Sequence, residues 1–298
     1  MSQLRVRVMS SLIGLVILAV AFVVFDTYLF NLIMAIVSMM AVQELFAAMG
    51  AAKTTSEEES MRLFAYRPEY RGFVIIAVIF SLMFAFAKEA ALWQRLPQAV
   101  FVLLLVFFLL ILKNHQSVRF EQASMIFLFS ILIPLGFACA VYIRCQFGDV
   151  LGRYYLLMGL GAAWLSDTGA YFTGMKFGRR KLAPVISPKK TVEGVIGGAI
   201  TATLLMCVLA FAYSQIAGAL GVNMRVNYAV ILLAMPFLSL AGVLGDLTMS
   251  SIKRQFGIKD YGTIMPGHGG ILDRFDSVLF TLPSVYILIQ YFPVVFLV

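Results

Sequence analysis

Residues 124–143 read SMIFLFSILIPLGFACAVYI, a run of 20 residues without a charged side chain. A helix that crosses the hydrocarbon core of a bilayer needs roughly 20 consecutive apolar residues, with a range of about 17 to 25. The chain contains further stretches of this kind, and the predicted spans are 8–25, 27–49, 73–89, 97–112, 124–143, 154–175, 192–217, 227–248 and 272–297. The first two are joined at Asp26-Thr27, which predicts a tight helical hairpin. The sequence therefore predicts an all-α polytopic membrane protein with nine transmembrane helices.

The composition of the whole chain excludes a soluble enzyme. Of its 298 residues, 61% are hydrophobic and 13% are charged, whereas about a quarter of an ordinary soluble domain is charged. The net charge of +8 is spread over short gaps between apolar runs, whereas a nucleic-acid-binding protein gathers its basic residues on one face. We therefore expect a lipid bilayer, and no nucleic acid, as the partner of this surface.

The basic residues predict the orientation of the spans. Cytoplasmic loops of membrane proteins carry an excess of Lys and Arg. With nine spans and a cytoplasmic N-terminus, most of the 23 Lys and Arg fall inside, and the outside loops carry only Lys88, Arg95, Arg144, Arg153 and Arg225. An even number of spans breaks this alternation, so we expect the N-terminus in the cytoplasm and the C-terminus outside.

Cysteine and histidine are too few and too scattered for most metal centres. Cys139, Cys145 and Cys207 show no paired spacing, which excludes a disulfide framework and a structural zinc site. The only histidines are His115 and His268. Carboxylates remain as candidate ligands, and oxygen ligands favour magnesium, calcium or manganese.

The two halves of the chain differ in where their acidic residues lie. In residues 1–150 the acids lie mostly in loops, and Glu44 lies near a span end, where its side chain can extend toward the interface. After residue 150 the acids lie within or beside predicted spans, at Asp167, Glu193, Asp246, Asp260, Asp273 and Asp276. We therefore predict membrane helices with a scaffold, dimer or lipid-access role at 1–150. We predict a catalytic membrane region with a cytoplasm-facing polar site at 151–298.

Asp167 and the basic loop after it are the first candidates for function. A charge in the apolar run 161–170 costs about 2.5–3.5 kcal/mol on insertion scales, so Asp167 indicates either a functional site or a structural ion pair. Ser187-Pro188 predicts a helix start, and Lys189-Lys190 would then add positive charge to the positive end of the helix dipole. That arrangement favours a bound anion. The alternative is that these lysines anchor the chain to lipid headgroups, which leaves Glu193 unexplained.

The densest polar stretch runs from Gly245 to Asp276. Asp246 ends the eighth predicted span, and Asp273 and Asp276 begin the ninth on one helix face, where like charges repel unless a cation intervenes. Mg²⁺ is usually held by one or two carboxylates together with water and phosphate oxygens. Each feature has an ordinary alternative, because aspartates often pair with a helix dipole and a lone histidine is more often a turn residue. Together, in a chain so poor in charge, they indicate a site.

This stretch resembles the signature of the phosphatidate cytidylyltransferases, also called CDP-diglyceride synthases. The matching residues are Ser250, Lys253, Arg254, Lys259, Asp260, Gly262, Pro266, His268, Gly269, Gly270, Asp273, Arg274 and Asp276. One position departs from the pattern, since Met265 stands where another aliphatic residue is more usual. Residues 166–172 and 187–194 also resemble the family, so the likeness covers residues 160–280.

The resemblance implies an enzyme of the bacterial cytoplasmic (inner) membrane, a homodimer with its active site facing the cytoplasm. It would join CTP to phosphatidic acid and release CDP-diacylglycerol and pyrophosphate, with Mg²⁺ as cofactor and K⁺ as a possible second cation. Carried over onto matching positions, Asp246 and Asp273 become the metal ligands.

The candidate roles follow from the charges and the resemblance together. The phosphate monoester is already ionised at neutral pH, so its oxygen can attack the α-phosphorus of CTP without a general base. The task left to the protein is positioning and charge neutralisation. Catalytic candidates are Asp246, Asp273, Lys253, Arg254 and His268, and substrate-binding candidates are Lys189, Lys190, Lys259, Arg274 and Ser250. Metal-ligand candidates are Asp246, Asp273 and Asp276, with Asp167 and Glu193 as further ligands.

Two other functions fit part of the pattern. A cation-coupled transporter would use the intramembrane acids, but such sites tend to lie near the midplane between related repeats, and no repeat is visible. A CTP-dependent polyprenol kinase would transfer a phosphoryl group instead of a nucleotidyl group, and product analysis separates the two. A CDP-alcohol phosphotransferase would need an Asp-Gly-x-x-Ala-Arg motif, which does not occur in the chain.

Overall fold

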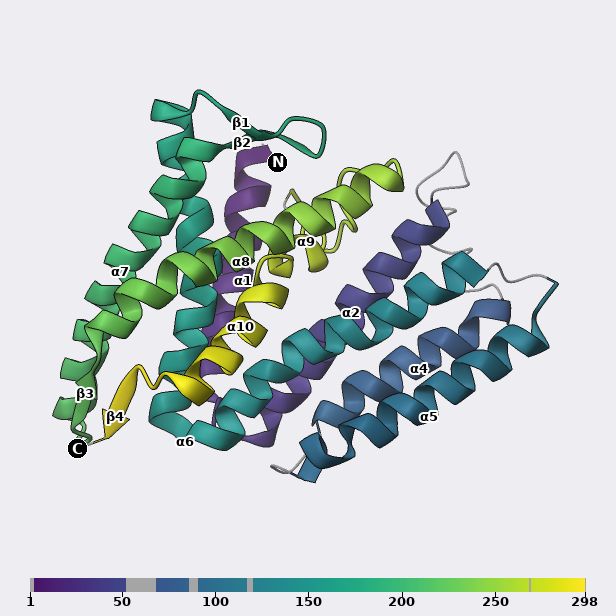
Figure 1. Cartoon of the computed structure of the whole chain (residues 1–298), viewed down its shortest axis with the longest axis horizontal. Coiled ribbons are helices and arrows are strands. Elements are labelled where there is room, and N and C mark those ends of the chain that lie inside the picture. The colour runs from purple at the N-terminus through teal and green to yellow at the C-terminus, as the bar shows by residue number, and fades with distance from the viewer. Residues whose placement is uncertain (1–2, 52–67, 86–90, 117–119, 268, 298) are drawn as a thin grey trace. The chain divides into compact units, whose positions relative to one another are not determined.

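Helices form most of the chain in a computed structural model, which describes residues 3–51, 68–85, 91–116, 120–267 and 269–297 (Figure 1). The chain divides into two compact units. The first comprises Met1–Cys145 with Lys253–Arg274, and the second comprises Gln146–Ile252 with Phe275–Val298. The segment that contains Asp273 thus folds with the N-terminal helices. A division of roles near residue 150 stays a prediction.

The first unit is built on α1 (Gln3–Val23), α2 (Tyr28–Ala51), α4 (Pro68–Ala85), α5 (Ala91–Lys113) and the first part of α6 (Phe120–Phe177). The hairpin predicted between the first two spans is present, and the Thr27 hydroxyl donates to the Val24 carbonyl at 2.7 Å within its turn. α2 packs against α4, where the buried hydroxyls of Ser38 and Ser81 are hydrogen-bonded at 3.0 Å. Such polar pairs join membrane helices that have no hydrophobic drive to associate in lipid.

α6 changes direction at Gly148, whose φ is 67° and ψ is −162°. Only glycine adopts a positive φ of this kind at little cost. A Cβ atom at this position would meet nothing within 4 Å, so the backbone conformation and not the available space favours glycine. The predicted spans 124–143 and 154–175 lie on the two sides of this break, and both stretches are helical.

The second unit continues from α6 into a short hairpin and three further helices. Its elements are β1 (Lys181–Ala183), β2 (Ser187–Thr191), α7 (Val192–Ala219), β3 (Met224–Val226), α8 (Tyr228–Gln255), α10 (Val278–Tyr291) and β4 (Val295–Leu297). The end of α8 and the four-residue helix α9 (Leu272–Phe275) lie where the chain passes between the units. In the part of the chain that the structure describes, the strands form two two-stranded antiparallel sheets, β1 with β2 and β3 with β4, and this part is essentially helical.

The predicted helix start at Ser187-Pro188 is wrong. Both residues lie in β2, which pairs with β1 so that Ser187 lies opposite Ala183. α7 begins at Val192 instead, because Thr191 acts as its N-cap and accepts a hydrogen bond from the Gly194 N–H at 3.1 Å. Lys189 and Lys190 therefore lie in a strand and not in the first turn of a helix.

α7 lies in close backbone contact with the last part of α6. A Cβ atom on Gly198 would collide with the Ser166 carbonyl oxygen and would lie 3.0 Å from the Ala170 Cβ. A Cβ atom on Gly169 would lie 2.6 Å from the Thr201 Cβ. Small residues allow membrane helices to approach this closely. The contact fixes the part of α6 that carries Asp167 against α7.

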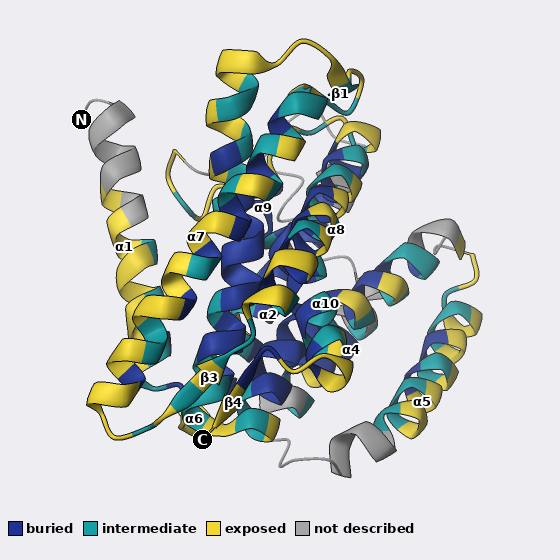
Figure 2. Cartoon of the chain, turned by 60° about the vertical axis from the view of Figure 1, so that its left-hand side comes forward, coloured by how far each residue is buried: buried dark blue, intermediate teal, exposed yellow. Residues whose placement is uncertain are grey.

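Five helices among the described residues are long and apolar enough to cross a membrane. They are Tyr28–Ala48, Leu96–Lys113, Ala123–Phe177, Val192–Ala219 and Tyr228–Gln255. Figure 2 shows exposed residues along α5 and α7, and those of α7 include Ile196, Leu204 and Phe211. Apolar surface on this scale is rare on soluble proteins. The chain is therefore a membrane protein, while the count of nine spans and the sides of the termini stay predictions.

The last predicted span, 272–297, is not one continuous helix. α9 ends at Phe275, α10 covers 14 residues, and the chain then forms β4. The Asp276 carboxylate accepts a hydrogen bond from the Ser277 N–H at 2.8 Å, between the two helices. Aspartate side chains compete in this way for backbone groups that a helix would otherwise use. At about 1.5 Å per residue, α10 alone is about 21 Å long, short of the roughly 30 Å hydrocarbon core.

Candidate active site

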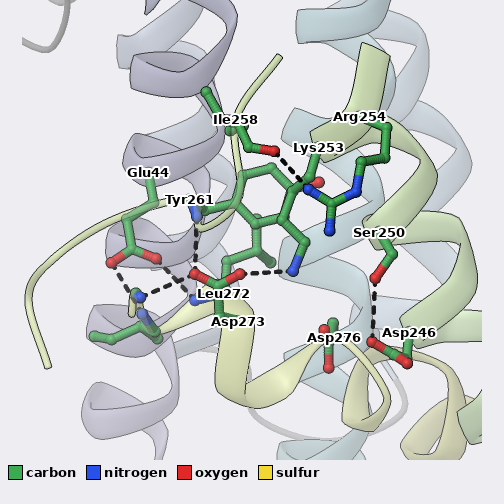
Figure 3. Close-up of polar contacts among 12 residues, drawn as sticks. Glu44, Asp246, Ser250, Lys253, Arg254, Ile258, Tyr261, Leu272, Asp273 and Asp276 are labelled. Carbon is green, nitrogen blue, oxygen red and sulfur yellow. Dashed lines mark hydrogen bonds and ion pairs between the residues drawn. The ribbon is translucent and has the colours of Figure 1, made fainter. Parts of the chain in front are cut away.

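The Asp273 carboxylate lies at the centre of a buried polar cluster in the first unit (Figure 3). Its Oδ1 accepts a hydrogen bond from Lys253 Nζ at 2.8 Å, and its Oδ2 accepts the backbone N–H groups of Tyr261 at 2.8 Å and Gly270 at 2.9 Å. The side chains of Lys253 and Asp273 are only 9% and 3% exposed. A buried ion pair is tolerated when further hydrogen bonds satisfy its charges, and the two backbone N–H groups supply such bonds here.

A glycine turn places the backbone against this carboxylate. Gly267 and Gly269 have φ angles of 76° and 83°, and the Met265 N–H donates to the Gly269 carbonyl at 3.0 Å. A Cβ atom on Gly269 would lie 3.0 Å from Asp273 Oδ2, so a side chain there would both strain the backbone and press on the carboxylate. The Gly270 N–H, next in the chain, is one of the donors to Asp273.

Glu44 in α2 holds the next two residues of the same loop. Its carboxylate accepts the backbone N–H of Ile271 at 2.9 Å and that of Leu272 at 2.8 Å, as Figure 3 shows. Only 4% of Glu44 is exposed, so its side chain does not extend to the interface as the sequence suggested.

A second polar cluster lies in the second unit, where α6, β2, α8 and the segment before α10 supply charged and hydroxyl groups. Lys190 in β2 forms an ion pair with Asp246 in α8, and its Nζ lies 4.0 Å from Asp167 Oδ1 in α6. The Ser277 hydroxyl lies 3.3 Å from Asp167 Oδ2 and 3.5 Å from Asp276 Oδ1. Lys190 and Ser277 thus link three predicted site aspartates.

Ser250 joins the same cluster, while the other candidates lie elsewhere. The Ser250 hydroxyl lies 3.4 Å from Asp246 Oδ1, one turn earlier in α8. The Glu193 carboxylate accepts the backbone N–H groups of Arg179 at 3.0 Å and Arg180 at 3.1 Å, so it fixes the start of the β1–β2 hairpin. Exposed candidates are Lys189, Arg254, Lys259 and Arg274, of which Arg254 donates to the Ile258 carbonyl at 3.2 Å. His268 lies outside the described residues.

Comparison with known proteins identifies the family of the chain. The sequence profile described as the cytidylyltransferase family matches residues 5–292. The chain belongs to the cytidylyltransferase family. The resemblance inferred from the motif is therefore confirmed.

Curated relatives of the chain carry the name phosphatidate cytidylyltransferase, among them the following three. The protein of Bacillus subtilis (strain 168) is 38% identical over 224 residues, which cover 73% of this chain and 78% of the relative. The protein of Staphylococcus haemolyticus (strain JCSC1435) is 42% identical over 177 residues, covering 59% and 62%. That of Staphylococcus aureus (strain COL) is 37% identical over 219 residues, covering 72% and 78%.

The donor chemistry of this cytidylyltransferase fits a magnesium ion, although its carboxylates do not converge. Within the described ranges, no three Asp, Glu, His or Cys residues lie close enough together to hold a metal. Mg²⁺ keeps several waters and needs only one or two carboxylates besides substrate phosphates. In the second unit the Lys190 ammonium lies between Asp246 and Asp167, the kind of position that a cation takes. Asp273 uses three of about four acceptor positions of a carboxylate, which leaves one.

The sequence predicted most of the charged residues in both clusters but missed the groups that hydrogen-bond to them or to their loop. Tyr261 contributes through its backbone N–H, which no residue pattern reveals. Ser277 directly follows the recognised motif and bridges its last acid, Asp276, and Asp167 in α6. Glu44 carried a usable signal, because an ionisable residue inside an apolar helix is a functional candidate by default.

Proposed function

We propose that this chain transfers the cytidylyl group of CTP to phosphatidic acid, which yields CDP-diacylglycerol and pyrophosphate for phospholipid synthesis. The observation that carries this proposal is the match to a relative named phosphatidate cytidylyltransferase over 73% of the chain. The Lys253–Asp273 and Lys190–Asp246 pairs support it, because Asp246 and Lys253 lie on the apolar helix α8, and charged groups in membrane helices are expensive and mark functional sites.

The reaction is a nucleotidyl transfer in which the protein mainly positions and neutralises charge. An ionised phosphate oxygen of the lipid bonds to the α-phosphorus of CTP, and the bond from that phosphorus to the bridging oxygen breaks. Pyrophosphate leaves with the bonding electron pair. Because the second pKa of a phosphate monoester is about 6, the attacking oxygen carries no proton at pH 7 and needs no base.

The proposed ligands of Mg²⁺ are Asp246 and Asp273, with Asp276 as a third and Asp167 as a further candidate. When bound, the ion neutralises the triphosphate and favours the departure of pyrophosphate. K⁺ is the proposed second cation. Glu193 has both oxygens engaged by backbone N–H groups, so its proposed share is to orient the basic hairpin.

Basic side chains are the proposed contacts for the negative charge of both substrates. Lys190 faces carboxylates in a partly exposed pair, so it can shift between an acid and a phosphate oxygen as substrates arrive. Lys253, which Asp273 holds in place, is a further proposed phosphate contact. Ser250 and the exposed Lys189, Arg254, Lys259 and Arg274 are further proposed phosphate contacts. His268 is proposed to donate to the departing pyrophosphate.

The proposed setting is the cytoplasmic (inner) membrane, with nine spans, a cytoplasmic N-terminus, an external C-terminus and a homodimeric state. The distribution of Lys and Arg along the chain supports this orientation, and it puts the site on the side that contains CTP. A reporter fused after Val298 should be non-cytoplasmic. A cytoplasmic reading would exclude the nine-span arrangement.

The decisive experiment uses purified protein in mixed micelles with phosphatidic acid, Mg²⁺ and CTP labelled at the α-phosphate. The expected result is label in the lipid phase that depends on Mg²⁺ and is lost in Asp273→Asn. Label from the γ-phosphate in the lipid phase would instead establish a kinase. If neither label enters lipid in intact protein, the transporter hypothesis should be tested by cation flux in proteoliposomes.

A further inference from the structure

Glu44 is the one acidic residue of α2, a helix apolar enough to cross the membrane. Its side chain is buried, with 4% of the residue exposed. Burying a carboxylate is unfavourable unless donors replace the water that it loses. The groups that donate hydrogen bonds to Glu44 therefore indicate why an acid occupies this position.

Both oxygens of Glu44 accept hydrogen bonds from consecutive backbone N–H groups far away in the sequence. Oε1 accepts from Ile271 at 2.9 Å, and Oε2 accepts from Leu272 at 2.8 Å. These two residues directly precede Asp273, whose Oδ2 accepts the N–H of Gly270. Every backbone N–H from Gly270 to Leu272 thus ends on a buried carboxylate.

Two glycines leave room for the Glu44 carboxylate. A Cβ atom on Gly262 would lie 2.6 Å from Glu44 Oε1, and one on Gly270 would lie 2.6 Å from Glu44 Cδ. Neither glycine is among those with positive φ, so their backbone conformation is open to other residues. The space taken by the carboxylate is what requires glycine at these two places. The segments that contain Gly262 and Gly270 therefore both pack against the Glu44 carboxylate.

We propose that Glu44 is a positioning residue for Asp273: a carboxylate clamp on α2 that fixes the Gly270–Leu272 backbone and thereby aims the Asp273 side chain. The proposal gives the N-terminal helices a share in turnover that the motif at 245–276 does not contain. Its kinetic consequence rests on the proposed cytidylyl transfer, while its structural consequence does not.

The main variant is Glu44→Gln, which keeps the size of the side chain but replaces one acceptor with a donor. One of the two N–H groups then loses its acceptor, and the loop shifts away from it. Misplacing a reacting group by about 1 Å can cost on the order of 100-fold in rate. We expect kcat to fall by about 10- to 100-fold, with the KM values for CTP and phosphatidic acid changed by less than about 3-fold.

Two variants of the same helix serve as controls. Ser38→Ala removes a buried hydrogen bond between α2 and α4, and Gln43→Ala changes an exposed neighbour of Glu44. Both should keep kcat within about 2-fold of wild type, even where Ser38→Ala lowers Tm as much as Glu44→Gln does. If Ser38→Ala matches Glu44→Gln in both Tm and kcat, Glu44 is only structural and the proposal is wrong.

A double-mutant cycle tests the contact itself. Gly270→Ala should lower kcat about 10-fold in the wild-type chain, because its methyl group meets the carboxylate of Glu44. In the Glu44→Ala background that space is open, so the same substitution should lower kcat by less than about 2-fold. Equal losses in both backgrounds would overturn the proposal.

Hydrogen exchange tests the contact between Glu44 and the loop without measuring turnover. In Glu44→Gln the amides of Ile271 and Leu272 should exchange about 10-fold faster or more, because one has lost its acceptor, whereas Ser38→Ala should leave them unchanged. Unchanged exchange in Glu44→Gln would refute the clamp. If exchange responds but wild type transfers no cytidylyl group, the clamp stands and the proposed function fails.

Discussion

Asp273 in the first unit accepts hydrogen bonds from two backbone N–H groups and an ammonium, whereas Asp246 in the second unit meets the side chains of Lys190 and Ser250. The Asp273 pair is 9% and 3% exposed, while the Lys190 and Asp246 side chains are 22% and 19% exposed. Backbone donors are fixed by the fold, and lysine and serine side chains can rotate. Asp273 is therefore rigidly preorganised, and Asp246 can change partners when a substrate arrives.

The largest effect is expected for Asp273→Asn, which should lower both activity and stability. Turnover should fall by about 100- to 1000-fold, the range typical of losing one electrostatic contact to developing charge. Breaking a buried pair from one side leaves Lys253 uncompensated and costs about 3–5 kcal/mol. Incorporation of α-label from CTP into lipid and Tm in detergent measure the two losses.

Replacing both members of the Lys253–Asp273 pair distinguishes the loss of turnover from the loss of stability. Lys253→Met combined with Asp273→Asn removes both charges and should recover most of the lost Tm, because no buried ammonium is left uncompensated and an amide oxygen at position 273 can still accept the N–H groups of Tyr261 and Gly270. The double variant should remain inactive. Activity near wild type in Asp273→Asn would remove Asp273 from the site, and an unchanged Tm would show that the pair is not rigidly held.

Asp246→Asn should lower turnover with a smaller loss of stability, whereas Asp273→Asn should lower both strongly. We expect a 10- to 100-fold loss of turnover, because the proposed metal ligand and the partner of Lys190 are both weakened. Tm should fall less than in Asp273→Asn, since the Asp167 carboxylate, 4.0 Å from Lys190 Nζ, still faces the ammonium after the change. A Tm loss as large as that of Asp273→Asn would contradict the contrast between the clusters.

Lys190 and Lys189 form a matched pair within β2. Lys190 faces Asp246 and Asp167, whereas its neighbour Lys189 is exposed. Lys190→Ala should lower kcat/KM for CTP about 10-fold, and Lys189→Ala should lower it by less than about 2-fold. Equal effects measured with varied CTP and varied phosphatidic acid would make both residues lipid anchors.

The charged residues of the site were more predictable from sequence than the contacts that hold them in place. Asp167 was predicted because a charge in an apolar helix is costly, and Asp246 and Asp276 because they lie in the densest polar stretch, which resembles the family signature. The structure links the three through Lys190 and Ser277. The partners of Glu44 were not predictable, because they are backbone N–H groups 227 and 228 positions away. Side-chain patterns carry no information on where a backbone amide points.

Local signals also failed where a tertiary partner competed with them. Ser187-Pro188 has the form of a helix start, yet pairing with β1 makes it a strand and moves the cap to Thr191. The apolar run at 272–297 has the length of a span, yet the Asp276 side chain takes the Ser277 N–H and separates α9 from α10. In the second place the competing side chain belongs to a candidate site residue.

The smallest expected effect tests whether the second cluster also depends on close helix packing. A methyl group on Gly198 would collide with the carbonyl of Ser166, which directly precedes Asp167. Gly198→Ala should cost about 1–3 kcal/mol of stability and a few-fold in turnover, because α7 and α6 can separate slightly to relieve the overlap. Gly218→Ala is the matched control in α7, since a Cβ atom there meets nothing within 4 Å.

Gly218→Ala should raise stability by about 0.5–1 kcal/mol, because alanine loses less backbone entropy in a helix, and it should leave turnover unchanged. Tm and label incorporation measured on both variants give the comparison. If Gly198→Ala leaves turnover unchanged while lowering Tm, the side chains of Lys190 and Asp246 adapt to the shift of Asp167, and the adaptability inferred for this cluster is sharpened. If it abolishes turnover, the second cluster is as rigidly positioned as Asp273, and the contrast between the two fails.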